Sequence, residues 1–393
     1  MKISSVDLLK LKTEGAGPVR PIICKINTDE GIYGLGEAGV AIVTGAYGAY
    51  ELLKDYAKRL IGMNPLHHEV IWEKLYKDTF WAQGNGAIIM AAISAVDTAL
   101  WDIKGKKYGV PVYELLGGKQ RDKLRTYASQ LQFGWGLTEY DRRGCIEKYE
   151  AACRAAKEQG YTAVKVNFFE QRKTGPNVNY LDTTGFLSAE IMHTAEERIA
   201  KTREIMGPDA DIILENHAMT DANSAIQFAK MAEKYHIMFL EEPATPLNHK
   251  VFEKIASKTS IPLATGERTF TRWGFRPLIE SGCISVAQPD IGNCGGITEC
   301  KKICDMAHVY DIGIQTHVCS SPISVAVSLQ LEAAIPNFVI HEHHAGNTLP
   351  GITCLGKYDY QPKDGYFDVP ELPGIGQDLS DYAISTAVSE TVS

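Results

Sequence analysis

Five short stretches decide the fold: IILENH at 212–217, MFLEEP at 238–243, PLATGER at 262–268, ISVAQPD at 284–290 and GIQTH at 313–317. Each stretch is a mostly apolar run that leads into an acidic residue or a histidine. Uninterrupted apolar runs are typical of strands that are covered on both faces, as in a parallel sheet. The spacing from one stretch to the next is about 25 residues, which suits one strand followed by one helix.

Working outward, the same alternation extends over residues 123–356. Eight strands with intervening helices predict a (β/α)7β barrel, a TIM barrel without its last helix. An open, doubly wound sheet is the alternative, and the even spacing of the strand ends favours the barrel. We expect strands at 124–129, 163–167, 212–215, 238–241, 262–266, 284–288, 313–316 and 338–341, and helices at 145–159, 190–206, 222–235, 250–258 and 298–310.

Residues 1–122 have a different texture and predict an α+β domain. Runs at 3–11, 21–27 and 32–38 are typical of a small antiparallel sheet, with a tight turn at 28–31. Helical patterns follow at 49–60, 67–77 and 87–108. The chain is therefore expected to be α/β, with two domains and a tail at 357–393.

Composition excludes several classes of protein. The chain has 393 residues, 45% hydrophobic and 22% charged, which is typical of soluble globular proteins. Its 40 basic and 48 acidic residues give a net charge of −8, so nucleic acid and anionic membranes are poor partners. Nine scattered cysteines, including Cys300 and Cys304, predict free thiols. No export signal is visible, and we expect a cytoplasmic protein.

The segment Gly34 to Gly39, GLGEAG, matches the glycine pattern of dinucleotide-binding proteins. That pattern requires a preceding strand, a helix that opens within it and a surrounding βαβ unit. Here the segment lies in an antiparallel meander, so we do not expect a nucleotide site.

Three carboxylates end three consecutive strands: Glu215, Glu241 and Glu267. All strand C-termini of a barrel open onto one face, so these groups converge and raise one another's proton affinity. A divalent cation between them removes this cost, and an all-oxygen site suits Mg²⁺ before Mn²⁺. The alternative is that these acids are solvated, which is our interpretation of the adjacent Glu242.

Histidines at the same face indicate proton chemistry. His217 shares a strand face with Glu215, so it should lie beside the metal. His317 ends the seventh strand and Asp290 the sixth, and a carboxylate bonded to one ring nitrogen makes the other a better base. His341 and His343 alternate with Glu342 and are interpreted as packing or rim residues.

Lys165 and Asn167 share one face of the second barrel strand. A lysine that faces into a barrel is costly unless it meets an anion. Lys165 is therefore a candidate for contacting a substrate carboxylate or a developing oxyanion, and the alternative is that it faces the helices.

Taken together, the motifs KVN (165–167), ENH, LEEP, ATGER, QPD, QTH and HEH (341–343) resemble the mandelate racemase subgroup of the enolase superfamily. Within it, the chain is most similar to acid-sugar dehydratases of the galactonate dehydratase kind. The resemblance extends over nearly the whole chain. It implies that residues 1–122 form a capping domain over the barrel and that the tail packs back on this cap.

The resemblance also implies one Mg²⁺ per active site on the three glutamates, with Mn²⁺ as a substitute. It implies that His317 and Asp290 form a base dyad and that Glu342 hydrogen-bonds an enolate oxygen. Two features depart from relatives: Asn167 stands where racemases carry a second lysine, and Glu215 stands where the first ligand is usually aspartate.

The activity implied is a Mg²⁺-dependent dehydratase that acts on a (2R)-sugar acid and yields a 2-keto-3-deoxy acid. His317 would remove the α-proton, Lys165 and Glu342 would stabilise the enediolate, and His217 would protonate the departing β-hydroxyl. A racemase or epimerase, or a non-catalytic sugar-acid sensor, are the alternatives. Relatives also suggest an even-numbered homo-oligomer, such as an octamer. The candidates for contacting the substrate are Asn167, Arg268 and, in the polar segment 170–187, Arg172, Lys173 and Tyr180.

Overall fold

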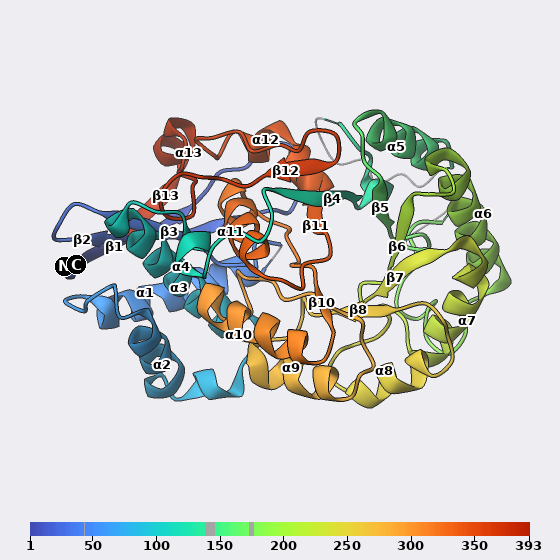
Figure 1. The fold of residues 1–393 in the computed structure, drawn as a ribbon, viewed down its shortest axis with the longest axis horizontal. Helices are drawn as coiled ribbons and strands as arrows, with labels where there is room; N and C mark the ends of the chain where they lie inside the picture. The colour runs from blue at the N-terminus through green and yellow to red at the C-terminus, as the bar shows by residue number, and fades with distance from the viewer. Residues whose placement is uncertain (43, 138–145, 173–176) are drawn as a thin grey trace.

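A computed structural model of the 393-residue chain describes residues 1–42, 44–137, 146–172 and 177–393. Two parts lie side by side: a mixed sheet-and-helix domain that contains both termini, and a ring of strands surrounded by helices (Figure 1). Lys173 lies outside the described residues.

The first part is the N-terminal domain. Its antiparallel sheet has the order β13-β1-β2-β3, and the last strand of the chain therefore pairs with the first. The long helix α3 packs against β3, α1 and the barrel helix α10, which explains why it is buried on most sides. The elements are β1 (Ile3–Lys10), β2 (Ile22–Thr28), β3 (Tyr33–Glu37), α1 (Gly45–Leu60), α2 (His68–Asp78), η1 (Trp81–Gly84), α3 (Ala87–Tyr108), α4 (Val112–Leu115), α13 (Asp381–Thr386) and β13 (Val388–Val392).

The second part is built on eight parallel strands in the order β10-β9-β8-β7-β6-β5-β4-β11. A parallel bridge between Ile314 and Phe338 joins the two ends of this order and closes the barrel. The predicted fold class is therefore confirmed, and the open-sheet alternative is wrong. The strands are β4 (Lys123–Ser129), β5 (Ala163–Val166), β6 (Asp211–Glu215), β7 (Ile237–Glu241), β8 (Leu263–Thr265), β9 (Val286–Ala287), β10 (Gly313–Ile314) and β11 (His341–His344).

One helix follows each strand from β4 to β10 and covers the outside of the barrel (Figure 1). These helices are α5 (Ile146–Glu158), α6 (Ala189–Met206), α7 (Ala222–Ala232), α8 (His249–Ala256), α9 (Thr271–Glu280), α10 (Gly296–Val309) and α11 (Pro322–Ala334). The shorter elements are η2 (Leu131–Phe133), η3 (Glu233–Tyr235), η4 (Ala345–Thr348), α12 (Pro350–Thr353) and β12 (Tyr366–Asp368), the last of which pairs with β4.

The last barrel strand differs from its prediction. We expected it at 338–341, where the residues are apolar, but β11 runs from His341 to His344. Buried histidines are tolerated in this strand because each has a partner. The Nδ1 of His341 lies 2.6 Å from Glu332 Oε2, and the Nδ1 of His343 lies 2.6 Å from the hydroxyl of Tyr161. The interpretation of His341 and His343 as packing residues is consistent with these contacts.

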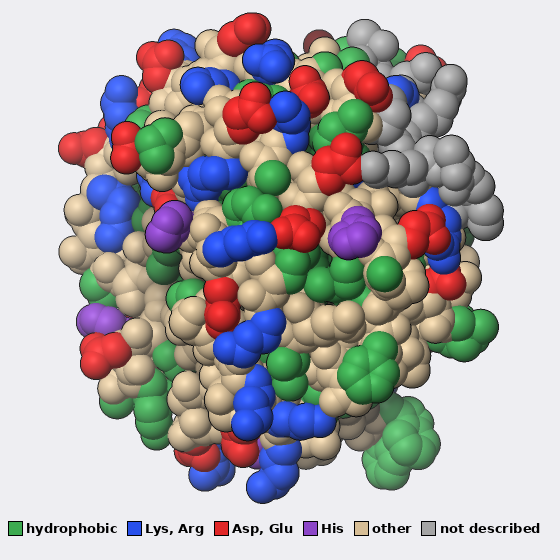
Figure 2. All heavy atoms as spheres, turned by 90° about the vertical axis from the view of Figure 1, so that its right-hand side faces the viewer, with side chains coloured by type: hydrophobic (Ala, Val, Ile, Leu, Met, Phe, Trp, Pro, Cys, Tyr) green, Lys and Arg blue, Asp and Glu red, His purple; other side chains and the backbone are tan. Residues whose placement is uncertain are grey.

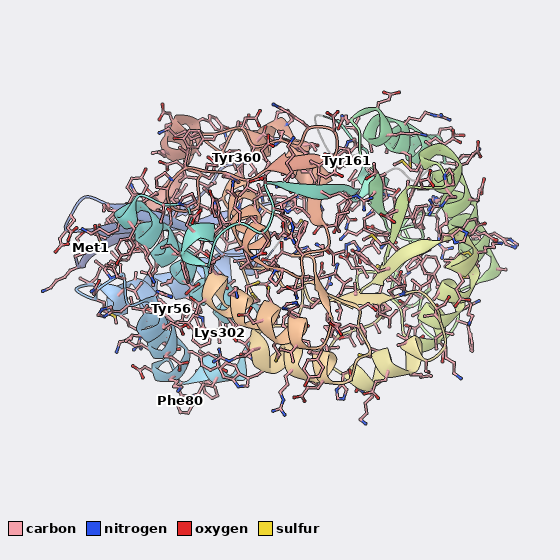
Figure 3. All side chains as sticks on the ribbon, in the orientation of Figure 1. Met1, Tyr56, Phe80, Tyr161, Lys302 and Tyr360 are labelled. Carbon is pink, nitrogen blue, oxygen red and sulfur yellow. The ribbon has the colours of Figure 1, made fainter. Side chains whose placement is uncertain are left out.

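The cap and the barrel are joined by packing and by ion pairs at the rim. Lys302 on α10 reaches toward the cap, where its ammonium lies 2.6 Å from Glu69 of α2 (Figure 3). Figure 2 shows the face of the barrel that lies away from the two chain termini. On this face, acidic and basic side chains are interspersed among the described residues. No helix among the described residues is long and apolar enough to cross a membrane.

The described cysteines are all free, including Cys300 and Cys304, which are buried on α10. The prediction of free thiols is confirmed for them. Cys145 lies outside the described residues.

Candidate active site

The strand ends converge as expected. Glu215 and Glu241 end the adjacent strands β6 and β7 and are partners in the parallel register. Glu267, Asp290 and His317 each follow the end of β8, β9 or β10 by two or three residues. Lys165 lies in β5 and contacts Glu215 and Glu241, and Glu342 in β11 contacts Lys165.

Lys165 faces into the barrel and forms the centre of a carboxylate cluster. Its Nζ lies 2.5 Å from Glu241 Oε1, 2.9 Å from Glu342 Oε1 and 3.2 Å from Glu215 Oε2. Burial alone would lower the pKa of Lys165, but Glu241 and Glu342 outweigh it and hold that pKa well above its usual value. The alternative of a helix-facing lysine is wrong.

Glu215 and Glu241 lie in an environment that disfavours their ionised forms. Burial raises the pKa of Glu215, although the Lys165 ammonium works in the opposite direction. Burial and the charge of Glu215 raise the pKa of Glu241 well above its usual value. Glu241 Oε2 accepts a hydrogen bond of 2.6 Å from Gln288 Nε2, but Glu215 Oε2 is buried without a hydrogen-bond donor in suitable geometry.

These observations test whether the residues fit a metal. Within the described residues, no three His, Cys, Asp or Glu side chains are already arranged around a point where an ion could bind. Lys165 takes up part of the negative charge of Glu215 and Glu241, and Arg268 contacts Glu267. The chemistry of the candidate ligands nevertheless fits a hard divalent cation, because all three are carboxylates and Glu215 Oε2 has no hydrogen-bond donor in suitable geometry.

His317 and Asp290 form the expected pair. His317 Nδ1 lies 2.7 Å from Asp290 Oδ2, and His317 Nε2 lies 3.2 Å from Glu267 Oε2. Burial would lower the pKa of His317, but Glu267 and Asp290 outweigh it and raise that pKa to about 10. Burial likewise opposes ionisation of Glu267, but the charges of His317 and Arg268 lower its pKa to about 2.

His217 lies on the opposite side of the barrel mouth, since β6 and β10 are four strands apart in the closed order. Both ring nitrogens contact side-chain amides: Nδ1 is 3.3 Å from Asn167 Nδ2, and Nε2 is 3.1 Å from Gln130 Nε2. Burial lowers the pKa of His217, which favours the neutral ring. The Asn167 Oδ1 accepts hydrogen bonds from two backbone amides that follow it, so this side chain orients His217.

Glu342 is held as an acceptor. Its Oε1 accepts from Ser129 Oγ at 2.7 Å, and its Oε2 accepts from the backbone amide of Val318 at 3.0 Å. Burial opposes ionisation, but Lys165 and His317 outweigh it and hold the pKa of Glu342 well below its usual value. The lowered pKa favours the carboxylate form, in which Glu342 accepts hydrogen bonds.

Glu242 corrects our interpretation of it as a solvated acid. Its side chain is fully buried, because a left-handed backbone (φ 48°) turns it away from Glu241 and toward Arg268. Arg268 Nη1 lies 2.6 Å from Glu242 Oε2, and the same nitrogen contacts Glu267. Burial and Glu267 raise the pKa of Glu242 to about 7.

A cavity of about 260 Å³ opens at this mouth and receives side chains from both parts of the chain. Of the predicted residues, His217, Glu267, Arg268 and His317 line it, and the cap contributes apolar side chains. Arg172 instead pairs with Asp182 at 2.9 Å, and Tyr180 is largely exposed. The cavity is also lined by Pro18, Val19, Ile42, Gln130, Phe133, Glu170, Cys319 and His344.

Two of these lining residues had a signal in the sequence that we did not use. Gln130 directly follows the first barrel strand, the position that carries a site residue at other strand ends. His344 is two residues beyond Glu342, so it lies on the same face of β11. The cap residues had no such signal, because a loop that reaches another domain carries no periodicity.

A closed barrel with acids and a histidine–aspartate pair at its strand ends, joined to an N-terminal α+β domain, is the architecture of enolase-type enzymes. Residues 10–117 match the N-terminal domain family of mandelate racemase and muconate lactonizing enzyme. Residues 148–383 match the enolase C-terminal domain-like family. The chain belongs to the enolase superfamily, in its mandelate racemase subgroup, and is an enzyme.

Individual relatives span the whole chain. A D-galactonate dehydratase of Ralstonia pickettii is 34% identical over 97% of this chain and 93% of its own length. An enolase superfamily member from Salmonella Typhimurium has a solved structure with a TM-score of 0.96, 50% identity and full coverage of both chains. The 3,6-anhydro-D-galactonate cycloisomerase of Zobellia galactanivorans is 26% identical, with a TM-score of 0.83 and coverage of 99% and 100%.

Proposed function

We propose that the protein is a Mg²⁺-dependent acid-sugar dehydratase, which converts a (2R)-sugar acid to a 2-keto-3-deoxy acid with loss of water. The observation that carries this proposal is the His317–Asp290 pair at 2.7 Å, with its second ring nitrogen directed at Glu267. The dehydratase of Ralstonia pickettii, similar over 97% of the chain, supports the reaction class. We also propose a cytoplasmic, even-numbered homo-oligomer.

The metal site would be formed by Glu215, Glu241 and Glu267. When bound, Mg²⁺ would supply the positive charge that holds a substrate carboxylate and makes its neighbouring C–H bond more acidic. Lys165 would then no longer be needed between Glu215 and Glu241, and its ammonium could turn to the substrate oxygen.

His317 is assigned the role of base. Asp290 accepts at Nδ1, so Nε2 is the nitrogen that receives the C2 proton. In the present arrangement the surrounding carboxylates raise the pKa of His317 to about 10, which keeps its proton in place. Neutralising the charge of Glu267 lowers that proton affinity and leaves Nε2 able to accept.

His217 is assigned the role of acid. It faces the cavity from the side opposite to His317, so a substrate between them presents C2–H to one ring and C3–OH to the other. The proton from C2 passes to His317, the C3–O bond breaks, and the leaving hydroxyl takes a proton from the imidazolium form of His217 and departs as water. The enol that remains loses the proton of its C2 hydroxyl, takes a proton at C3 and becomes the 2-keto-3-deoxy acid.

Epimerisation at C2 is the second candidate. It requires a base on each face of the carbon, and the neutral form of His217, favoured by its lowered pKa, could provide the second one. Asn167, in place of a second lysine, is the observation that favours dehydration instead.

The experiment that tests the proposal incubates the protein and Mg²⁺ with hexonic, pentonic and aldaric acids and detects keto products with semicarbazide. We expect at least one (2R) acid to be converted. If no acid is converted but C2 exchanges its proton in D₂O with inversion, the protein is an epimerase. If neither occurs with any acid, the proposed function is wrong.

Variants separate the two histidines. His317→Asn should lower both exchange at C2 and dehydration by about 10²- to 10⁴-fold. His217→Asn should keep exchange and lose product, and an equal loss of both would contradict its assignment as the acid. His308→Asn is the matched control, because His308 is exposed on α10 and remote from the barrel mouth.

A further inference from the structure

The glycine-rich segment 34–39, which does not bind a nucleotide in our interpretation, has another role. Gly34 and Gly36 lie on β3 and allow α3 to approach closely: a Cβ would lie 2.0 Å from the carbonyl oxygen of Ala99 at the first and 1.9 Å from that of Ala95 at the second. Gly39 comes after the strand and contacts the barrel instead. The segment therefore lies between the cap helix and the loops of the active site.

Gly39 packs closely against the loop that carries Asp290. Its backbone amide donates to the carbonyl of Gly292 at 2.7 Å. A Cβ at Gly39 would lie 2.6 Å from the Gly292 carbonyl carbon and 2.9 Å from Asp290 Oδ1. That same oxygen accepts from the Gly292 amide at 2.7 Å, which leaves Oδ2 to contact His317.

Glu37 holds the loop that carries His317. Its carboxylate is 3% exposed and accepts hydrogen bonds from Ser321 Oγ at 2.6 Å and Ser324 Oγ at 2.8 Å. It also accepts from Ser320 Oγ and, at 3.3 Å, from the backbone amide of Ser321. These serines lie three to seven residues after His317, at the start of α11.

From these contacts we propose that Glu37, together with the close approach of Gly39, is a positioning residue of the cap that fixes His317 relative to Asp290. The inference rests on the proposed role of His317 as base. Glu37 and both members of the dyad line one small pocket between cap and barrel, although the carboxylate of Glu37 contacts neither member directly. Its effect would pass through the two loops, each of which is attached to the same end of β3.

The physical reason is the narrow tolerance of proton transfer. A displacement of about 1 Å in a catalytic group can cost about 10²-fold in rate. His317 lies outside a regular strand, since β10 ends at Ile314, and its loop depends on outside contacts for its position. Glu37 lies at the end of a cap strand and accepts hydrogen bonds from four donors of this segment.

The test compares Glu37→Ala with Asp102→Ala. Asp102 is also a fully buried cap carboxylate, but it holds Leu35, Ile375 and Lys106 rather than the active-site loops. Both variants should lose thermal stability. Only Glu37→Ala should lower kcat for C2 exchange, by about tenfold or more. Glu37→Gln keeps a hydrogen-bond acceptor, so it should retain most of the wild-type kcat. Asp102→Ala should keep kcat within about twofold.

A second measurement does not depend on any substrate. In protein with ¹⁵N-labelled histidine, the proton between His317 Nδ1 and Asp290 should give a downfield resonance, identified by its absence in His317→Asn. Glu37→Ala should shift or broaden it, and Asp102→Ala should not. If wild-type protein converts no acid sugar, the proposed function fails, and this resonance still decides the role of Glu37.

The inference is overturned if Glu37→Ala and Asp102→Ala have the same effect on the resonance, whatever their stability. Should Glu37→Ala fail to fold, Gly39→Ala replaces it, because the added Cβ would collide with the Asp290 loop from the segment that directly follows β3. An unchanged resonance in Gly39→Ala would equally overturn the inference.

Discussion

The barrel mouth and the cap–barrel interface both bury carboxyl groups, but they stabilise them in different ways. At the interface, Asp97 accepts from the backbone amide of Thr298 at 2.9 Å and from its hydroxyl at 2.6 Å. Asp102 accepts from two backbone amides and from Lys106. At the mouth, Glu215 and Glu241 lie against each other and share one lysine.

This difference shows which buried acids indicate function. An acid with a donor for each oxygen is explained by the fold, whereas an acid whose neighbours are acids is not. The mouth gathers six carboxyl groups around two permanent cations, Lys165 and Arg268: those of Glu215, Glu241, Glu242, Glu267, Asp290 and Glu342. The fold therefore gathers more carboxyl groups than permanent cations, and a bound cation would stabilise the ionised form of these groups.

The largest expected effect concerns activity at the mouth. Glu215→Gln should lower turnover by about 10³-fold, a loss typical of removing a group that stabilises the transition state. The same change should raise the free energy of unfolding of metal-free protein by about 1 kcal/mol, because one buried charge is removed. Activity assays and urea unfolding in EDTA measure both.

The control for this variant is Asp97→Asn, which should lose stability and keep turnover. If Glu215→Gln instead destabilises the metal-free protein as much as Asp97→Asn does, the carboxylates of the two regions are equally well stabilised. The comparison between mouth and interface would then be wrong.

The second expected effect is stabilisation by the metal. Mg²⁺ at 100 times its Kd should raise the free energy of unfolding by about 2.7 kcal/mol, because it binds only the folded state. Thermal unfolding with and without Mg²⁺ measures this. Asp97→Asn should keep the full increase, and Glu215→Gln should lose most of it. An equal increase in all three proteins would place the ion elsewhere.

Sequence was sufficient for the barrel and for its strand-end acids, because both depend on regular spacing. It was insufficient where a partner far along the chain decides a residue's environment. Buried His341 is stable in β11 only because Glu332 reaches it. Buried Glu242 is paired with Arg268, which lies 26 residues further along the chain, and also accepts a hydrogen bond from Thr265. Lys165 faces into the barrel and meets anions, as one of our two interpretations required, but these anions are glutamates of the protein rather than a substrate carboxylate.

The third expected effect lies at the interface. The hydroxyl of Thr298 accepts from Trp101 Nε1 at 2.8 Å and donates to Asp97. Thr298→Val keeps the shape but leaves both partners unsatisfied, which should cost about 1–3 kcal/mol of unfolding free energy. Turnover should stay within about twofold, since the change lies outside the dyad contacts.

Its matched control is Thr391→Val on β13, where an exposed hydroxyl bonds Asp7 at 2.7 Å. That bond competes with water, so its loss should cost less than about 0.5 kcal/mol. If Thr298→Val and Thr391→Val lose the same amount of unfolding free energy, the interface does not depend on its buried hydrogen bonds.

The smallest expected effect tests how well the interface stabilises Asp97. Burial raises the pKa of Asp97 to about 7, although the hydrogen bonds from Thr298 work in the opposite direction. In the unfolded chain an aspartate has a pKa of about 3.9. Between these values the folded protein keeps a proton that the unfolded chain has released, so stability falls as pH rises.

From pH 6 to pH 7 this contribution should amount to about 1 kcal/mol. Asp97→Asn removes it, so the difference in unfolding free energy between wild type and variant should change by that amount over this range. Urea unfolding at the two pH values measures it, and the other titrating groups cancel because both proteins contain them. A constant difference would mean that Asp97 is already ionised at pH 6. The hydrogen bonds from Thr298 would then be sufficient to offset the effect of burial on the pKa of Asp97. The interface would stabilise its ionised carboxylate, whereas the mouth does not stabilise those of Glu215 and Glu241.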